Sequence, residues 1–360
     1  MKIALVTHRY FPNVGGIETH VRELAERLSK DHVVEVLTAD LAPSLKSTEV
    51  LNGVKITRFS SLKWGNTVYY TPRIQSYLEK NRFGIIHAHN YHALPALSAA
   101  KAADNNLVFT PHYHGTGSSP ATSLLLHPYS FIGTHIFTKA RRVICVSEYE
   151  KSLVHRDFSV DASRISVIPN GIPLASIRNA DPFPDHHNLI LYIGRLDRYK
   201  NIDLVIKAML YLPDFSFFII GKSGNYKKEL HHIIQTLHLS DRVKILDSVS
   251  DADKNRWLKT CSLFINLSDI EAFGITVLEA VAAEKPVIVN NAGGLAQLAS
   301  KFRQVYPIDR KDYNSEESLQ ELASLFSLKA GHEYQENLRD YEWDEILKKT
   351  EREYFLLDDN

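Results

Sequence analysis

The sequence predicts an α/β protein made of two doubly wound parallel sheets in series. Two observations carry this prediction. Short apolar runs alternate with amphipathic helical patterns from residue 2 to residue 146, and the alternation restarts at residue 189 and runs to residue 289. The chain has 360 residues, which is enough for two domains of ordinary size.

The first half is expected to contain six strands. They are residues 2–7, 33–37, 54–58, 84–87, 107–110 and 142–146. Helical patterns separate most of them. Residues 15–28, for example, form a loop that enters a helix with Val21, Leu24 and Leu28 on one face. This rhythm is typical of a parallel sheet with helices on both faces.

The second half repeats the rhythm. Its expected strands are residues 189–193, 215–220, 243–246, 263–267 and 286–289, and its expected helices include 202–210, 226–237 and 254–259. Turn-forming residues at 170–173 and a polar stretch at 181–187 mark the joint between the halves. We therefore expect domains over residues 1–172 and 173–340, followed by a helical tail over 341–360. The tail's aromatic and apolar residues must pack on something: Tyr341, Trp343, Ile346, Tyr354 and Phe355.

The composition is that of a globular protein, with 44% hydrophobic and 23% charged residues. Only two cysteines are present, which argues against a disulfide framework and favours a reducing compartment. The apolar run at the N-terminus is too short for a signal peptide, and no stretch approaches the ~20 apolar residues of a membrane span.

The charges are unevenly distributed along the chain. Residues 1–170 contain 19 Lys and Arg against 13 Asp and Glu, whereas the remainder contains 23 against 29. A basic half suggests an anionic partner or surface. The alternative is that two domains of opposite charge attract each other.

The most informative stretch places Glu271 and Glu279 eight positions apart around a glycine turn. An apolar strand at 263–267 precedes it, and Gly274-Ile275-Thr276 begins a helix, where free backbone N–H groups favour an anion. Glu271 then lies in the loop and Glu279 inside the helix, roughly 10 Å away. This arrangement suits a ligand with a phosphate in the middle and hydroxyls at both ends, such as a nucleotide sugar. The alternative is an ordinary strand–loop–helix joint with two solvated glutamates.

Two other loops follow the first strand of each half. Gly15-Gly16 opens a helix and permits close backbone approach to an anion, although a plain tight turn explains it equally well. Arg195 and Lys200 follow the strand at 189–193, at the edge where doubly wound sheets bind ligands. Arg grips an oxyanion bidentately and Lys acts as a point charge. Solvated loop charges are the alternative.

Three patterns resemble metal or nucleotide motifs. Gly221-Lys222-Ser223 fails as a P-loop because Ser216 stands where a glycine is required. Asp251-Ala252-Asp253 has a metal-binding spacing, but capping of a helix beginning near Lys254 explains it more simply.

The third pattern is a set of histidines after two strands, His87-Ala88-His89 and His112-Tyr113-His114. Such spacing can hold zinc, but no well-placed acidic ligand accompanies it. A sugar or phosphate contact from one or two of these histidines is the favoured interpretation, and the others are surface or core groups.

Taken together, these segments resemble the retaining glycosyltransferases of family 4 (GT4), which have the GT-B fold. The resemblance spans nearly the whole chain in the family's order. The segments that carry it are Gly15-Gly16-Ile17-Glu18, Thr110-Pro111-His112, Val146-Ser147-Glu148, Pro169-Asn170-Gly171, Gly194-Arg195-Leu196 with Lys200, Glu271 with Glu279, and Gly293-Gly294.

The resemblance implies roles for individual residues. Arg195 and Lys200 would neutralise the donor diphosphate, and Gly274, Ile275 and Thr276 would offer it backbone N–H groups. Glu279 would bind the ribose and Glu271 the transferred sugar. In the first domain, Gly15 and Gly16 would approach the diphosphate as the domains close, and His112 would lie near the reacting carbon.

The resemblance also implies two Rossmann-like domains facing across a cleft, with a C-terminal helix that crosses back to the N-domain. The implied function is metal-independent transfer of a hexosyl group from a UDP- or GDP-sugar to a glycan or lipid-linked acceptor, in cell-envelope glycan or glycolipid synthesis. No cofactor and no nucleic-acid partner are expected. The alternatives are a nucleotide-sugar epimerase or hydrolase on the same fold, or a non-catalytic carbohydrate-binding relative.

The chain departs from the family at two points. Ala272 stands where glycine is common, with little expected effect. Leu295-Ala296-Gln297 stands where an acidic step often follows the glycine pair, which leaves the identity of the donor open.

The expected location is cytoplasmic. An apolar and aromatic stretch with basic residues at 118–142, together with Lys63, Trp64, Tyr69 and Tyr70, suggests contact with an anionic membrane on the inner face of the cell. Ordinary helix packing is the alternative for this stretch.

Overall fold

The computed structural model describes residues 1–64, 68–115, 120–221, 224, 226–309 and 315–358. It divides the chain into two compact units. The N-terminal unit comprises Met1–Gly171 and Trp343–Asn360, and the C-terminal unit comprises Ile172–Glu342. The chain thus leaves the first unit after Gly171 and returns to it at Trp343, whereas the sequence-based boundaries are residues 172 and 340.

The N-terminal unit contains an eight-stranded sheet in the order β10-β9-β8-β7-β1-β2-β4-β3. The strands are β1 Lys2–Thr7, β2 Val33–Thr38, β3 Thr48–Leu51, β4 Val54–Arg58, β7 Ile85–His89, β8 Leu107–Thr110, β9 Arg142–Cys145 and β10 Ile165–Val167. Neighbouring strands pair in parallel except for β3 and β4, an antiparallel hairpin. A separate hairpin joins β5 Leu62–Trp64 to β6 Val68–Tyr70. Every residue of β7 is buried, as expected for a parallel strand covered on both faces.

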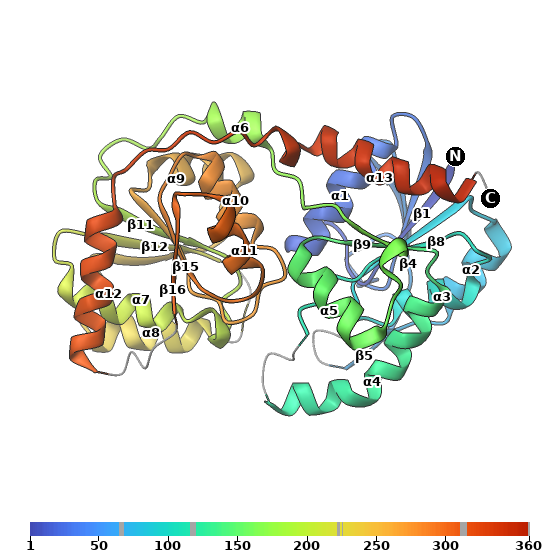
Figure 1. Ribbon diagram of the computed structural model, residues 1–360, viewed down its shortest axis with the longest axis horizontal. Coiled ribbons are helices and arrows are strands. Elements are labelled where there is room, and N and C mark those ends of the chain that lie inside the picture. The colour runs from blue at the N-terminus through green and yellow to red at the C-terminus, as the bar shows by residue number, and fades with distance from the viewer. Residues whose placement is uncertain (65–67, 116–119, 222–223, 225, 310–314, 359–360) are drawn as a thin grey trace. The chain divides into compact units, whose positions relative to one another are not determined.

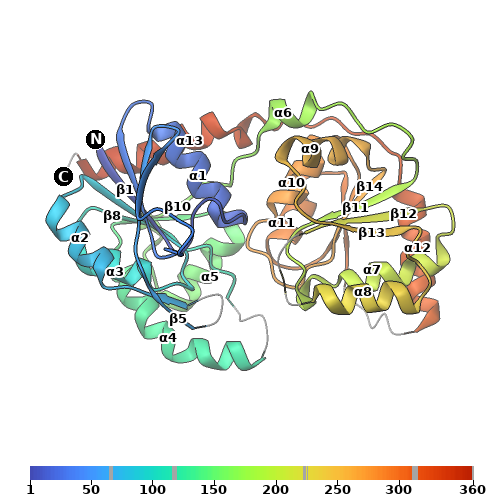
Figure 2. The same cartoon turned by 180° about the vertical axis from the view of Figure 1, so that it is seen from behind.

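Helices cover both faces of this sheet (Figures 1 and 2). They are α1 Gly16–Leu28, α2 Arg73–Asn81, α3 Pro95–Ala102, α4 Pro120–Lys139, α5 Glu148–Phe158 and α13 Trp343–Asp358. One buried cluster lies under α1 and α13 and includes Leu24, Ile346 and Tyr354. A second includes Ala99 of α3 and Phe137 of α4. The sheet therefore has an apolar core on each side.

The C-terminal helix α13 belongs to the N-terminal unit and lies beside α1 (Figures 1 and 2). Trp343, Ile346 and Tyr354 are buried, and the hydroxyl of Tyr354 is 2.7 Å from Nδ1 of His87. A Cβ at Gly171 would collide with the indole of Trp343, so glycine lets the returning helix pack closely. Phe355, which was expected to pack with them, is instead 49% exposed.

The C-terminal unit contains a six-stranded parallel sheet in the order β13-β12-β11-β14-β15-β16. Its strands are β11 Leu189–Ile193, β12 Ser216–Ile220, β13 Val243–Leu246, β14 Leu263–Asn266, β15 Val287–Asn290 and β16 Val305–Ile308. Its helices are α6 Leu174–Arg178, α7 Ile202–Ala208, α8 Lys227–Thr236, α9 Asp251–Thr260, α10 Ile275–Ala282, α11 Gly293–Lys301 and α12 Glu316–Lys329. Four short 3-10 helices complete the described elements: Ala162–Arg164, Arg198–Lys200, Met209–Tyr211 and Arg339–Tyr341.

Each sheet has a point where the strand order reverses. In the N-terminal unit β1 lies between β2 and β7, and in the C-terminal unit β11 lies between β12 and β14. The loops that leave β1, β11 and β14 therefore begin at the carboxyl edge beside this reversal, where open α/β sheets bind ligands. These are the loops that carry most of the predicted site residues.

Several details differ from the sequence-based expectation. Helix α9 begins at Asp251 rather than near Lys254, with Ser250 as its cap. The strands β3, β5, β6, β10 and β16 were not expected, because they are short and lie at sheet edges or in a separate hairpin. Among the aromatics proposed for membrane contact, Tyr69 and Phe137 are buried. None of the described helices is long and apolar enough to cross a membrane.

Candidate active site

The loop after β11 holds the two cations predicted to bind phosphate. Arg195 is largely exposed, and its guanidinium donates to the hydroxyl of Tyr199 at 2.5 Å and lies 3.5 Å from the Asp197 carboxylate. Asn201 adopts the left-handed conformation, with φ 53°, that turns the chain from the 3-10 helix into α7. Its side-chain amide donates to the Leu267 carbonyl at 2.7 Å, which ties this loop to the end of β14.

Lys200 is buried and points at the neighbouring loop. Its Nζ lies 2.7 Å from Oε2 of Glu271, so the structure joins two of the predicted site residues in one ion pair. Burial lowers the pKa of Lys200, but the Glu271 carboxylate and Tyr199 outweigh it, so the net pKa is raised. Lys200 therefore carries a fixed positive charge inside the site.

Helix α10 starts at the predicted anion cradle. Its cap, Gly274, has φ 96°, a conformation that side-chain-bearing residues rarely adopt, and no side chain caps the helix. A Cβ at Gly274 would lie 2.8 Å from Cδ2 of Leu295. The first-turn amides of Ile275 and Thr276 have no intrahelical acceptor by the geometry of a helix start. The helix dipole adds positive potential at the same place.

Glu279 lies one turn further along α10 and is 4% exposed. Its Oε1 is 2.5 Å from Nζ of Lys254, which comes from α9. The two glutamates of the motif are thus held by two different lysines. Sequence reasoning did not identify Lys254 as a partner, because its position on α9 relative to α10 depends on helix packing.

In the N-terminal unit, the glycine pair enters α1 after β1. Gly15 caps the helix without a side-chain hydrogen bond, and a Cβ there would collide with the carboxylate of Glu18. Glu18 is buried and lies 3.0 Å from Nε of Arg9 and 3.8 Å from Nε2 of His8. The first turn of this helix, which includes Gly16, therefore carries a buried acidic side chain that pairs with Arg9.

His112 follows β8 in a left-handed conformation, with φ 50°. A buried carboxyl group holds the loop at the next residue, since Glu150 accepts the Tyr113 N–H at 2.5 Å and the Val146 N–H at 2.6 Å. Burial raises the pKa of Glu150 to about 8, against the opposing effect of these two donors. Burial also lowers the pKa of His112, so its imidazole is neutral. Glu150 was not predicted, although Ser147-Glu148-Tyr149-Glu150 has the spacing of a capping box.

The Asp251-Ala252-Asp253 pattern is a helix start. The Ser250 hydroxyl accepts the Asp253 N–H at 3.0 Å and donates to the Asp253 carboxylate at 2.8 Å. The P-loop-like Lys222 and Ser223 lie outside the described residues. Among the described residues, the histidines His20, His89 and His112 form the group close enough together to hold a metal ion.

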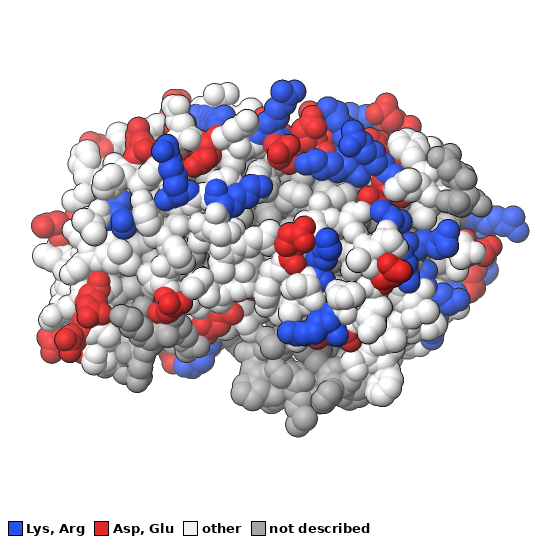
Figure 3. All heavy atoms as spheres, viewed as in Figure 1, with Lys and Arg blue, Asp and Glu red and all other residues white. Residues whose placement is uncertain are grey.

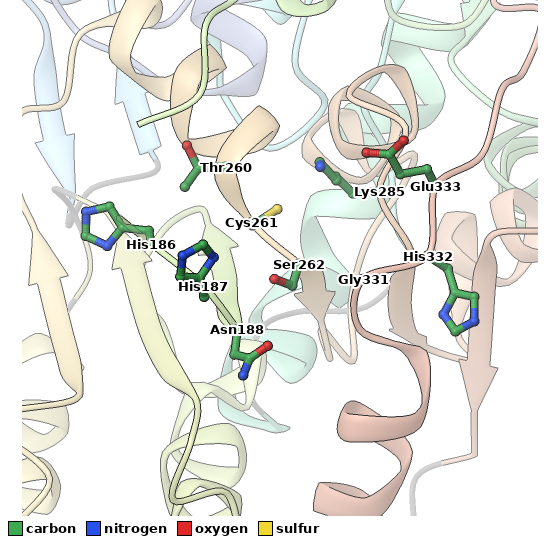
Figure 4. A pocket seen from close by; sticks show the side chains of 10 residues that line it. All are labelled: His186, His187, Asn188, Thr260, Cys261, Ser262, Lys285, Gly331, His332 and Glu333. Carbon is green, nitrogen blue, oxygen red and sulfur yellow. The ribbon is translucent and has the colours of Figure 1, made fainter. Parts of the chain in front are cut away.

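A cavity of about 280 Å³ lies elsewhere in the C-terminal unit (Figure 4). It is lined by His187, Asn188, Ser262 and Lys285, among others. Asn188 and Ser262 immediately precede β11 and β14, so this cavity is at the amino edge of the sheet. Arg195, Glu271 and Gly274 follow the carboxyl ends of the same strands, and the cavity is therefore separate from the candidate site.

Comparison with known proteins shows the family of the chain. Residues 14–176 match the family model described as Glycosyltransferase Family 4, and residues 175–342 match Glycosyl transferases group 1. The chain belongs to glycosyltransferase family 4. It is a glycosyltransferase enzyme, as the sequence resemblance predicted.

Curated relatives extend over almost the whole chain. One component of human phosphatidylinositol N-acetylglucosaminyltransferase is 26% identical and matches 98% of this chain and 75% of its own length. The phosphatidyl-myo-inositol mannosyltransferase of Mycolicibacterium smegmatis is also 26% identical, over 98% of this chain and 93% of its own.

Solved structures confirm the predicted fold. Sucrose-phosphate synthase from Thermosynechococcus elongatus superposes with a TM-score of 0.79 at 20% identity, covering 99% of this chain and 98% of its own. Anabaena HepE in complex with UDP-glucose gives 0.76 at 18% identity, covering 98% of each chain. Both units of this family 4 enzyme therefore have the Rossmann-like α/β architecture of the GT-B fold.

Proposed function

We propose that this glycosyltransferase is a retaining hexosyltransferase that uses a UDP- or GDP-sugar and needs no metal. The observation that carries the proposal is that cationic, acidic and anion-binding groups lie together in the C-terminal unit. Arg195, the Lys200–Glu271 pair and the uncapped start of α10 all follow strands at one edge of a parallel sheet. Cations and an anion-binding helix start beside a carboxylate suit a sugar joined to a diphosphate.

The donor would bind in a defined direction. Arg195 and Lys200 neutralise the diphosphate, and the amides of Gly274, Ile275 and Thr276 donate to its oxygens. Glu279 accepts hydrogen bonds from the ribose hydroxyls, and Glu271 accepts them from the transferred sugar. Lys200 already pairs with Glu271, and in this proposal the diphosphate is a second anion for the same lysine.

In the proposed transfer, the bond from the anomeric carbon to the β-phosphate oxygen breaks and a bond from that carbon to the acceptor oxygen forms. The acceptor hydroxyl gives its proton to the leaving phosphate oxygen on the same face. Charge grows on the β-phosphate as the bond breaks, and one fixed donor aimed at it is worth about 3 kcal/mol. Burial lowers the pKa of His112 and makes it a poor proton acceptor, so we assign it to contact with the sugar near the reacting carbon rather than to proton transfer.

We propose that the acceptor is a glycan or a lipid-linked molecule in cell-envelope glycan or glycolipid synthesis. In support, the names of two relatives describe sugar transfer to phosphatidylinositol. A neighbouring structure holds UDP-glucose, which supports a nucleotide-sugar donor. These names do not choose between UDP and GDP for this chain.

Contact with the inner face of the membrane is part of the proposal. In the N-terminal unit, Phe131 on α4 is 81% exposed and Tyr70 is 37% exposed, so both can reach a surface. Arg142 instead forms an ion pair with Glu353 of the same unit. The side chains of residues 120–128 and of Lys63 and Trp64 lie outside the described ones. On the face in Figure 3, Lys and Arg of this unit lie among Asp and Glu rather than in a single basic patch.

Co-sedimentation with vesicles tests the membrane contact. Binding to anionic vesicles at low salt that weakens in Phe131→Ser supports the contact. The absence of binding at low salt contradicts it.

The donor is tested by thermal shift with UDP, GDP and ADP and their sugars. A nucleotide at 100 times its dissociation constant should stabilise the protein by about 2.7 kcal/mol. Glu279→Ala should abolish most of this shift, whereas Glu229→Ala should not, because Glu229 pairs with Arg198 on an exposed surface. No shift with any nucleotide would contradict the proposal.

The reaction is then followed with the donor that binds. Transfer to an added acceptor with the anomeric configuration kept supports a retaining transferase. Release of free sugar or its epimer, without transfer, supports the hydrolase or epimerase. Binding of donor without turnover supports the non-catalytic relative. Activity that survives a chelator supports independence from metals.

A further inference from the structure

Three histidines from separate parts of the N-terminal unit converge beneath the carboxyl edge of its sheet. His20 lies on α1, His89 ends β7, and His112 follows β8. The ring centroid of His20 is 5.5 Å from those of His89 and His112, and the latter two are 5.9 Å apart. One ring nitrogen from each histidine lies within 4.8 Å of the corresponding nitrogens of the other two.

These rings have unused hydrogen-bonding capacity. Nδ1 of His20, both ring nitrogens of His89 and Nε2 of His112 are buried without a hydrogen-bond partner among the described residues. Leaving a buried polar atom unpaired costs about 1–3 kcal/mol. Neighbouring His87 is buried too, but both of its ring nitrogens have hydrogen-bond partners: the Tyr354 hydroxyl at 2.7 Å and the Thr110 hydroxyl at 2.8 Å. His20 has a side-chain hydrogen bond to Asn170, but these four nitrogens are unpaired and therefore available to bind a ligand.

Burial keeps the three imidazoles uncharged, which is the form that binds a metal ion. Burial lowers the pKa of His20 to about 4, and it also lowers the pKa values of His89 and His112 well below the usual range. Protonating one ring also opposes protonating the next, because the positive charges would lie side by side. Neutral imidazole nitrogens are the commonest protein ligands for Zn²⁺.

We propose that His20, His89 and His112 form a site for a Zn²⁺-class transition-metal ion. Zn–N bonds of about 2.1 Å at tetrahedral angles place ligand nitrogens about 3.4 Å apart. The ligand nitrogens here lie within 4.8 Å of one another, so metal binding would draw them together by at most roughly 1.4 Å. Three protein nitrogens leave the ion one further position for water or a small anion.

The site would inhibit transfer rather than support it. His112 is the residue proposed to contact the transferred sugar, and a metal-bound imidazole is no longer available for that contact. This consequence rests on the proposed function, whereas metal binding itself does not. The same enzyme would transfer sugar without metal and be blocked when Zn²⁺ occupies the three histidines.

Binding is measured on chelator-stripped protein without a histidine tag, by competition with a chromogenic chelator. Wild type should bind one Zn²⁺ per chain, and Co²⁺ should give the visible absorption of a tetrahedral site. His20→Gln and His89→Gln should each weaken binding by about 100-fold or more, since even loss of a supporting partner costs 10–100-fold. His135→Gln is the matched control, because His135 is exposed on α4.

Wild type that binds no Zn²⁺ would overturn the proposal, as would binding unchanged in both folded variants. If the variants do not fold, hydrogen exchange of the wild type decides the question. Zn²⁺ should then protect peptides containing residues 20, 89 and 112, and protection elsewhere overturns the assignment. In the transfer assay, binding without inhibition leaves the metal site standing and contradicts the role given to His112.

Discussion

Replacing Gly274 by alanine tests how the start of α10 is built. The residue has φ 96°, so alanine should cost about 1–2 kcal/mol for a left-handed backbone. Its Cβ would also lie 2.8 Å from Cδ2 of Leu295 and 3.2 Å from Cδ1 of Leu298. Crowding of this kind in a packed region costs about 1–3 kcal/mol. The expected total loss of stability of the C-terminal unit is about 2–5 kcal/mol.

Gly331→Ala is a matched control for the backbone cost alone. Gly331 has φ 80° in the same unit, and a Cβ there would meet no atom within 4 Å. It should therefore cost only about 1–2 kcal/mol. The difference between the two variants measures the contact with the leucines.

Hydrogen exchange read by mass spectrometry provides the assay. The strand β14 is fully buried inside the sheet, so its amides exchange only when the C-terminal unit opens. The free energy of opening can therefore be compared between the two variants on the same amides. In a Leu295→Ala background, Gly274→Ala should lose part of its cost, giving a coupling energy of about 1 kcal/mol. Equal destabilisation by the two glycine substitutions would refute the contact argument. Unchanged nucleotide binding in Gly274→Ala would refute the placement of the diphosphate at this helix start.

The remaining predictions concern charge and packing. Arg195→Ala should slow transfer by about 100-fold or more, with little loss of stability because the side chain is exposed. Arg198→Ala is the control and should leave the transfer rate unchanged. Equal transfer rates in the two variants would contradict the site. Glu150 keeps its proton in the folded state up to about pH 8 but loses it near 4.5 when unfolded. Between about pH 4.5 and pH 8, wild type should therefore lose up to about 1.4 kcal/mol of stability per pH unit relative to Glu150→Gln. The same dependence of unfolding free energy on pH in both proteins would contradict this. Gly171→Ala should weaken the packing of Trp343 by about 1–3 kcal/mol, seen as faster exchange in α13, and unaltered exchange would count against the close contact.

Much of the fold could be predicted because its signals are local. The strands β1, β11 and β14 are short apolar runs, and each is followed by a loop whose glycine or cation is visible in the sequence. The edge strands β10 and β16 were not predicted, since Ser166 and Pro307 interrupt their short apolar runs. The start of α9 was misplaced because Asp251 and Asp253, taken as residues before the helix, occupy its first turn.

The pairing of charged residues could not be predicted in the same way. Lys200 meets Glu271 across 71 positions, and Lys254 meets Glu279 across 25. The family resemblance assigned each glutamate a part of the donor to bind. The lysine that pairs with it, however, depends on which loops and helices lie side by side. Glu150 reaches Tyr113 across 37 positions for the same reason, and it is the buried support of the loop that carries His112.

The sequence by itself determined the type of fold, the order of its elements and the loops that carry the candidate donor site. These properties follow from apolar periodicity and from glycines at turns, which act over a few residues. The tertiary structure alone decided that His20, His89 and His112 meet, and that the indole of Trp343 packs directly against Gly171. Such contacts join residues far apart in the chain, and only the packing of helices on the sheet brings their side chains within reach.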